Sequence, residues 1–149
     1  MTPPAKMHFV VLRVFCDGGA RGNPGPAGIG VVVKSSNGKK LHEFGKTIGV
    51  ATNNVAEYTA VIEALEWIAS NFKKKPQHIE FFLDSQLVVL QLTGIYRIKD
   101  AKLRILLMKV REKEAQIGGN ILYRHIPREV NTAADKLVNQ ALDGNMGLK

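Results

Sequence analysis

The sequence has little that could cross-link it or hold it in a membrane. Its 149 residues include one cysteine, Cys16, which cannot form an internal disulfide. No apolar run approaches the ~20 residues of a membrane span, and the segment from Met1 to Met7 lacks the apolar core of a signal peptide. The sequence therefore predicts a cytoplasmic protein without a membrane segment.

Acidic residues are also in the minority, with 13 Asp and Glu against 21 Lys and Arg and a net charge of +8. This excess favours a polyanionic partner, because phosphates bound by Lys and Arg release counterions. The basic residues gather at Lys39-Lys40, at Lys73-Lys74-Lys75 and from Arg97 to Lys113. Solvent-exposed faces would explain the same runs, so charge alone indicates no activity.

The hydrophobic share of 45% excludes a disordered chain. A chain of this length buries enough surface to fold without disulfides or structural metals. We therefore expect a single domain over residues 1–149, with loose ends at 1–6 and 144–149.

The segment from Phe9 to Val14 is apolar except for Arg13 and predicts a buried strand with Asp17 at its end. Six of the 14 glycines lie between residues 18 and 30, which indicates a tight turn that lets another backbone approach. Asp17 also suits an ordinary turn, and no Gly-Lys-Ser/Thr supports a nucleotide-binding loop. For Cys16 we expect an inert core residue rather than a thiol nucleophile.

The rest of the chain alternates between strand and helix patterns. An Asn37-Gly38 turn predicts a hairpin, apolar residues three and four apart predict long helices, and a strand reached through a helix is expected to lie parallel to the first. The expected strands are residues 28–34, 40–50, 79–83 and 121–126, and the expected helices are 55–72, 85–92, 99–117 and 132–142, the last behind an Asn131 cap.

Four acids have similar positions, at strand ends or in the first turns of helices: Asp17, Glu57, Asp84 and Asp135. Taken singly, Glu57 suits a capping pair with Asn54, and Asp84 suits a helix N-cap. If the strands before Asp17 and Asp84 are parallel neighbours, these carboxylates meet at one edge of the sheet. Clustered carboxylates repel one another, and oxygen-binding cations relieve that repulsion. A set without Cys or His favours Mg²⁺ or Mn²⁺, and two such ions about 4 Å apart can promote phosphodiester cleavage.

Four sequence runs resemble type 1 ribonuclease H in their order and spacing: FCDGGARGNPGPAGIG, TNNVAEYTAVIEAL, DSQLVV and PREVNTAADKL. The resemblance covers roughly residues 8–143. It implies an α/β ribonuclease H-like fold, a five-stranded mixed sheet in the order 3-2-1-4-5 with helices on both faces. It also implies hydrolysis of the RNA strand of an RNA·DNA hybrid, with 5′-phosphate and 3′-hydroxyl products, and matches Asp17, Glu57, Asp84 and Asp135 to the metal-binding acids.

The same resemblance implies contacts with the hybrid. Thr52 and Asn54 are similar to a pocket for a DNA phosphate, and residues near the minor groove are matched by Gly18, Asn23, Asn53 and Gln86. Base sequence should matter little, because 2′-hydroxyls and a deformable DNA backbone distinguish a hybrid from either pure duplex.

The chain departs from the family at two places. The stretch from Tyr123 to Glu129 is shorter than the flexible loop that carries a catalytic histidine in many members. His125 has a suitable offset from Asp135, but Pro127 and strand periodicity favour a strand position, so Arg128 or Glu129 could take part of that role. A longer basic, Trp-containing protrusion is missing after Gly94. Affinity would then depend on four bases, Arg97, Lys99, Lys102 and Arg104, while we expect Trp67 to be a packing residue.

Two other hypotheses remain at this point. One is a silent hybrid-binding module, which the presence of all four acids disfavours. The other is a metal-dependent nuclease or strand-transfer enzyme that acts on DNA, which would be expected to lack the run from Thr52 to Asn54 and to carry further DNA-binding domains. We expect a monomer.

Overall fold

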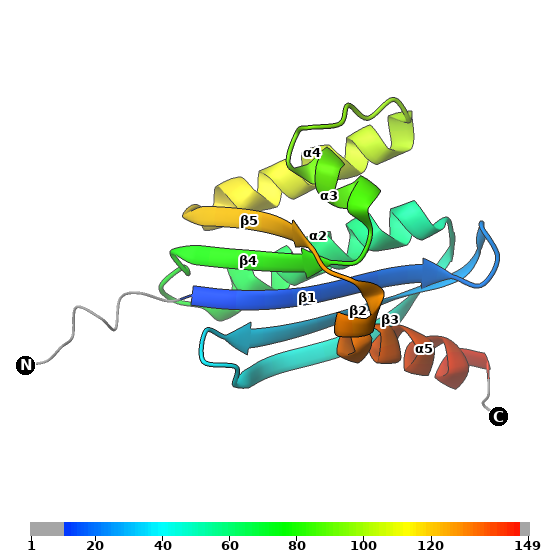
Figure 1. Cartoon of the computed structure of the whole chain (residues 1–149), viewed down its shortest axis with the longest axis horizontal. Coiled ribbons are helices and arrows are strands. Elements are labelled where there is room, and N and C mark those ends of the chain that lie inside the picture. The colour runs from blue at the N-terminus through cyan, green and yellow to red at the C-terminus, as the bar shows by residue number, and fades with distance from the viewer. Residues whose placement is uncertain (1–10, 147–149) are drawn as a thin grey trace, which may run out of the picture.

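The structure, a computed structural model, describes residues 11–146, and its strands form one mixed sheet (Figure 1). The expectations for residues 1–6, 9–10 and 147–149 lie outside the described residues. The elements in chain order are β1 Val11–Ala20, β2 Gly25–Ser35, β3 Lys40–Ala51, α2 Asn53–Asn71, β4 His78–Leu83, α3 Gln86–Leu92, α4 Ala101–Ile117, β5 Asn120–His125, η1 Arg128–Val130 and α5 Thr132–Met146.

The strand order is β3-β2-β1-β4-β5, which confirms the predicted topology. β1 pairs with β2 in antiparallel fashion, and β2 pairs with β3 in the same way. β4 lies parallel to β1, and β5 lies parallel to β4. The carboxyl ends of β1 and β4 therefore point the same way, as convergence of Asp17 and Asp84 requires.

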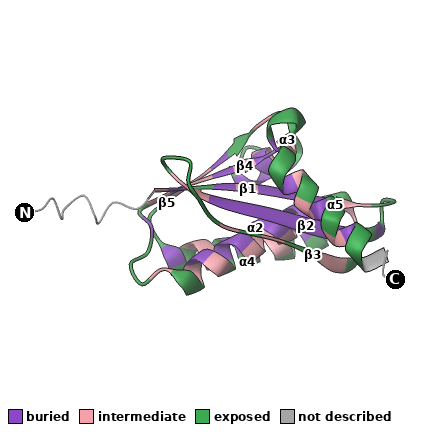
Figure 2. Ribbon diagram, turned by 90° about the horizontal axis from the view of Figure 1, so that it is seen from below, coloured by how far each residue is buried: buried purple, intermediate pink, exposed green. Residues whose placement is uncertain are grey.

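Helices cover both faces of the sheet. α2 and α4 pack on one face, and α5 packs on the other over β1, β2 and β3 (Figures 1 and 2). Alternation along β1 sends Leu12, Val14 and Cys16 into the main core with α2, while Arg13 and Phe15 face the other way. Among the described residues, no helix combines the length and apolar character needed to cross a membrane.

Two glycines allow helices to contact the sheet directly. A Cβ at Gly18 would lie 2.3 Å from the backbone carbonyl of Ala56, so only glycine lets the first turns of α2 reach β1 at this point. A Cβ at Gly30 would lie 2.2 Å from the carbonyl oxygen of Ala134 in α5. The first contact brings Glu57 next to Asp17, and the second brings the start of α5 close to the same part of the sheet.

Several local predictions are confirmed. Asn37 and Gly38 form the turn between β2 and β3, as predicted. Trp67 is a packing residue, because its ring stacks on His42 at 4.4 Å and meets Phe72 edge-on. Cys16 is buried, and burial together with the Glu57 and Asp17 charges raises the pKa of its thiol, so it is the inert core residue expected.

Some predicted boundaries are wrong. β1 continues through Asp17 to Ala20, because residues 17–20 pair with Ala27–Gly30 of β2, so Asp17 lies inside the strand. α5 extends to Met146, so the predicted loose end cannot begin at Gly144. Pairing with neighbours and packing on the sheet extended both elements beyond the local pattern.

Candidate active site

Three of the four predicted acids meet at the carboxyl ends of β1 and β4. Asp17 lies on β1, Asp84 directly follows β4, and Glu57 comes from the second turn of α2. Each offers a carboxylate oxygen, and these oxygens all lie within 4.8 Å of one another. We call Asp17, Glu57 and Asp84 the acid group.

The acid group is buried, and this disfavours its charged form. Desolvation, the charges of Asp84 and Asp135, and a side-chain hydrogen bond with Asp135 raise the pKa of Asp17 to about 8, against a hydrogen bond from the Gly18 backbone. Burial and the charges of Asp17 and Asp84 also raise the pKa of Glu57 well above its usual range. Asp135 thus lies close enough to act on Asp17, although it is outside the acid group.

Two oxygens of the acid group have no hydrogen-bond partner although they are buried: Glu57 Oε1 and Asp84 Oδ1. Buried polar atoms are almost always paired, so an unpaired carboxylate oxygen in this cluster is available to bind a ligand. Three clustered carboxylates without Cys or His suit a hard cation such as Mg²⁺ or Mn²⁺. The residues therefore fit a divalent metal ion.

The capping alternatives for these acids are wrong. The Thr52 side chain caps α2 by accepting from the Val55 amide, so the pair between Asn54 and Glu57 does not form. The Ser85 side chain caps α3 by accepting from the Val88 amide, so Asp84 is not the cap. Because neighbouring hydroxyls serve the helix ends, both carboxylates remain available to the acid group.

The predicted cap at Asn131 is also wrong. Its side chain is 1% exposed and donates from Nδ2 to the Cys16 carbonyl at 2.8 Å and to Asp84 Oδ2 at 3.1 Å. Its Oδ1 accepts no hydrogen bond and therefore caps no amide of α5. Asn131 is a residue of the site that the sequence pattern, read as a cap, did not reveal.

A cleft of about 330 Å³ opens beside the acid group. Asp17, Glu57 and Asp135 line it, and so do Gly18, Asn53 and Asn54 of the predicted substrate contacts. Lining residues that sequence reasoning missed include Ser85 and Asn139, whose Nδ2 donates to the Asp135 carbonyl oxygen at 3.2 Å. No local sequence pattern identified Ser85 and Asn139 as site residues, because they reach the cleft only through the placement of α3 and α5 in the fold.

A second cleft of about 360 Å³ lies next to the first and holds the predicted phosphate residues Thr52 and Asn54. Asn23 and Lys102 line it too, whereas Asn54 lines both clefts. Asn23 accepts from the Asn53 amide, and Asn53 accepts from the Ala20 amide, so these two side chains tie the β1–β2 loop to α2. Gln86, the first residue of α3, is exposed and lines neither cleft.

Three residues are candidates for the role of the loop histidine, namely His125, Arg128 and Glu129, and they lie in different places. His125 is the last residue of β5, which confirms the strand position, and it does not line the cleft beside the acid group. Arg128 in η1 does line that cleft, with an 80% exposed side chain whose Nη2 lies 4.0 Å from Asp84 Oδ1. Glu129 is exposed on the same short helix.

Comparison with known proteins relates this geometry to a family. A family model described as reverse transcriptase-like matches residues 15–141. Ribonuclease HI of Halobacterium salinarum is 46% identical over 133 residues, which are 89% of this chain and 64% of that protein. A bifunctional protein of Mycobacterium tuberculosis is 41% identical over 87% of this chain and 35% of its own length. This chain thus spans only part of these relatives.

Solved structures give the same result over nearly whole chains. LC11-RNase H1, in complex with an RNA/DNA hybrid, has a TM-score of 0.88 at 43% identity and covers 91% of this chain and 99% of its own. RNase H1 of Halobacterium salinarum has a TM-score of 0.83 at 44% identity, with 89% and 98% covered. The family model matches residues 15–141, and the strand order is the one that the family resemblance implied. Because the solved structures agree with both, the chain belongs to the type 1 ribonuclease H family.

Proposed function

We propose that this protein is an endoribonuclease that hydrolyses the RNA strand of RNA·DNA hybrids and leaves 5′-phosphate and 3′-hydroxyl ends. The observation that carries the proposal is the acid group, with two buried oxygens that lack a partner, at the side of an open cleft. The likeness to LC11-RNase H1, solved with an RNA/DNA hybrid, supports this choice of substrate.

Asp17, Glu57 and Asp84 would hold Mg²⁺ or Mn²⁺, with Asp135 completing the set for two ions when the hybrid is bound. The ions would activate the attacking water and stabilise the leaving oxygen. Asp17 and Glu57 supply the negative charge that attracts the ions, and their raised pKa values mean that binding also releases protons.

Arg128 contributes positive charge at the rim of the cleft beside the acid group. Arg128 approaches Asp84, and its charge opposes the rise in the pKa of Glu57. Its exposed guanidinium lines the cleft, so we propose that it would contact a phosphate of the cleaved strand and that Arg128 or Glu129 takes part of the role that a loop histidine has in other members.

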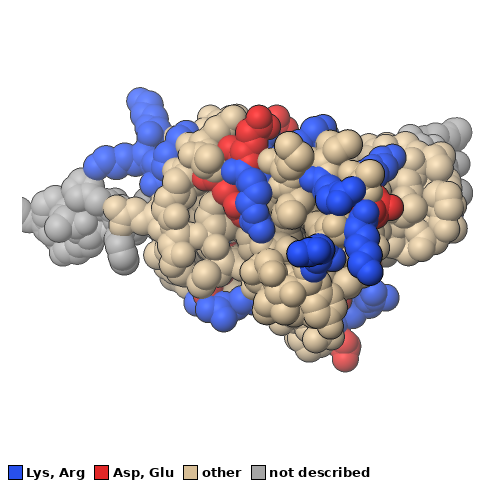
Figure 3. All heavy atoms as spheres, turned by 90° about the horizontal axis from the view of Figure 1, so that it is seen from above, with Lys and Arg blue, Asp and Glu red and all other residues tan. Residues whose placement is uncertain are grey.

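Residues that line both clefts would bind the hybrid. Thr52, Asn54 and Lys102 around the second cleft would hold a phosphate of the DNA strand, with Lys102 as the cation. Gly18, Asn23, Asn53 and Gln86 would lie along the minor groove. Lys and Arg side chains are spread over the face drawn in Figure 3, where acids lie beside some of them. The excess of bases suits a polyanion.

We also propose that the protein acts as a monomer in the cytoplasm. The single cysteine is free and buried, which suits a reducing compartment. Equilibrium sedimentation in the presence and absence of a short hybrid tests the oligomeric state.

The test of the activity is cleavage of end-labelled RNA·DNA hybrid, double-stranded RNA and double-stranded DNA with Mg²⁺, Mn²⁺ or a chelator. We expect metal-dependent cutting of the RNA strand of the hybrid, and no cutting with chelator. Hybrid binding without cutting would favour a silent binding module, whereas cutting of double-stranded DNA would favour a DNA-directed enzyme, and either would overturn the proposal.

A further inference from the structure

We infer that Asn131 is the positioning residue of the acid group: it fixes Asp84 and the strand that carries Asp17 in the arrangement that binds metal. The inference rests on the proposed function for its catalytic consequence. It goes beyond that function because Asn131 is neither one of the four acids nor a residue that lines either cleft.

The contacts of Asn131 join the elements that carry the acids. Both hydrogens of its Nδ2 have acceptors, the carbonyl of Cys16 on β1 and Oδ2 of Asp84 after β4. Cys16 immediately precedes Asp17, so the first bond holds the backbone beside that acid. The Asn131 backbone carbonyl accepts from the Asp135 amide at 3.1 Å, which is the ordinary first bond of α5 and does not depend on the asparagine side chain.

The bond to Asp84 decides which of its oxygens is available. Oδ2 is occupied by Asn131, whereas Oδ1 is buried without a hydrogen-bond partner. The side chain of Asp84 is 2% exposed, so little water can compete for either oxygen. Donors of this kind orient the carboxylates that bind metals, and their loss weakens metal binding even though they never touch the ion.

A purely structural role explains these contacts less well. An asparagine that only started α5 would turn Oδ1 towards the free amides of the first turn. Here Oδ1 has no partner, which is unfavourable in a side chain that is 1% exposed. The side chain gives up the cap and uses both donors on the part of the sheet that holds the acid group.

The experiment measures binding of Mn²⁺ to the protein without nucleic acid, by isothermal titration calorimetry. Asn131→Ala removes both donors, and we expect the dissociation constant for Mn²⁺ to rise ~10- to 100-fold, the usual cost of losing such a support. On the hybrid at fixed Mn²⁺, we expect a lower kcat with an unchanged KM, because Asn131 lines no part of either cleft.

The matched control is Val110→Ala, which truncates a fully buried residue of α4 in the main core. It should lower the free energy of unfolding and leave Mn²⁺ affinity unchanged. If Asn131→Ala does not fold, Asn131→Ser, which keeps one donor, is judged by the same criterion. An Mn²⁺ affinity equal to that of Val110→Ala, or a raised KM with an unchanged kcat, would overturn the inference.

Failure of this inference and failure of the proposed function are distinguishable. A parent protein that cuts hybrid, with an Asn131 variant that binds Mn²⁺ normally, overturns only the positioning role. A parent protein that does not cut hybrid, with an Asn131 variant that binds Mn²⁺ weakly, overturns only the function.

Discussion

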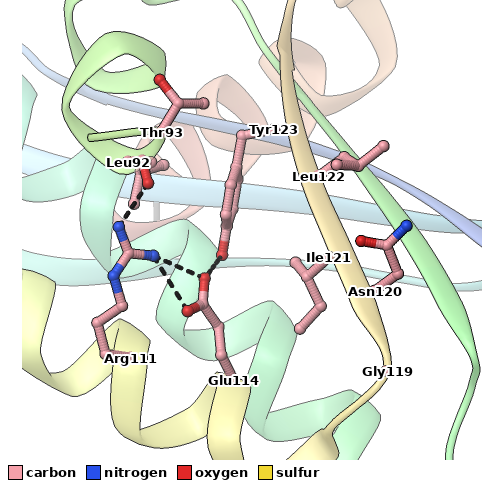
Figure 4. A pocket seen from close by; sticks show the side chains of 9 residues that line it. All are labelled: Leu92, Thr93, Arg111, Glu114, Gly119, Asn120, Ile121, Leu122 and Tyr123. Atoms are coloured by element: carbon pink, nitrogen blue, oxygen red, sulfur yellow. Dashed lines mark hydrogen bonds and ion pairs between the residues drawn. The ribbon is translucent and has the colours of Figure 1, made fainter. Parts of the chain in front are cut away.

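Two clusters of buried or half-buried polar groups differ in how their carboxylates are satisfied. In the acid group, Asp17, Glu57 and Asp84 meet with two oxygens that have no hydrogen-bond partner. The nearest cation described is Arg128, whose Nη2 lies 4.0 Å from Asp84 Oδ1, beyond hydrogen-bond distance. In the second cluster, Glu114 of α4 accepts two bonds from Arg111 and one from the Tyr123 hydroxyl (Figure 4). Arg111 also donates to the Leu92 carbonyl, so this cluster joins α4, β5 and the end of α3.

This difference in hydrogen-bond partners separates a structural carboxylate, Glu114, from the carboxylates of the acid group. Glu114 has a cation and a hydroxyl within hydrogen-bond distance, so it needs nothing from outside the chain. The acid group has the repulsion of like charges and raised pKa values, which the fold alone does not offset. A cavity of about 500 Å³ beside Glu114 is larger than the cleft beside the acid group, yet its polar groups already satisfy one another.

The strongest test exchanges one carboxylate for an amide in each cluster. We expect Asp84→Asn to lower the rate of hybrid cleavage by more than the ~100-fold that loss of a support for a metal ligand costs, because a ligand itself is lost. Glu114→Gln should keep the rate near that of the parent protein, since Glu114 lies outside both clefts. Single-turnover cleavage of end-labelled hybrid measures both. Equal losses in the two variants would contradict the distinction.

The second test concerns stability against pH in a chelator. The pKa of Asp17 is about 8 in the fold against 3.8 in the unfolded chain, so between these values the folded state holds a proton that the unfolded state has lost. The stabilisation that Asp17 contributes should therefore be fully present below about pH 4 and be lost as the pH rises to about 8.

Urea unfolding at a series of pH values measures this trend. Asp17→Asn removes the titrating group and should flatten the profile, and Mn²⁺ should restore stability on the alkaline side by binding the charged carboxylates. A difference in the free energy of unfolding between the parent protein and Asp17→Asn that does not change over this pH range would contradict the raised pKa of Asp17.

The third test removes Glu114 altogether. Glu114→Ala leaves Arg111 without its carboxylate and the buried Tyr123 hydroxyl without an acceptor, so we expect the free energy of unfolding to fall by ~1–3 kcal/mol. Urea denaturation in chelator measures the loss, with Glu112→Ala on an exposed position of the same helix as the control. A variant as stable as this control would remove the contrast with the acid group.

The sheet order was predicted from the resemblance to type 1 ribonuclease H, not from local patterns. Apolar periodicity located the elements, and the expected parallel pairing of the strands before Asp17 and Asp84 predicted that their carboxylates meet. The sequence pattern placed Asp17 at a strand end, since local composition cannot reveal that Asp17 still pairs with Gly30 of β2. It also read Asn131 as a cap. The contacts that give Asn131 its place, to Cys16 and Asp84, span 115 and 47 positions of the chain, and no local pattern contains them.

The smallest effect is expected at His125, which lies at the boundary between the two clusters. It is on β5, two residues after Tyr123, and its register partner is Leu83, the residue before Asp84. If His125 serves only as a residue of the strand, His125→Ala should keep most of the turnover. If it belongs to the acid group, the loss should reach the ~100-fold or more typical of a general acid or base. The kcat of His125→Ala with saturating hybrid, compared with Arg128→Ala, decides between them. Arg128 lines the cleft and His125 does not, so we expect the larger loss for Arg128; the reverse order would move His125 into the active site.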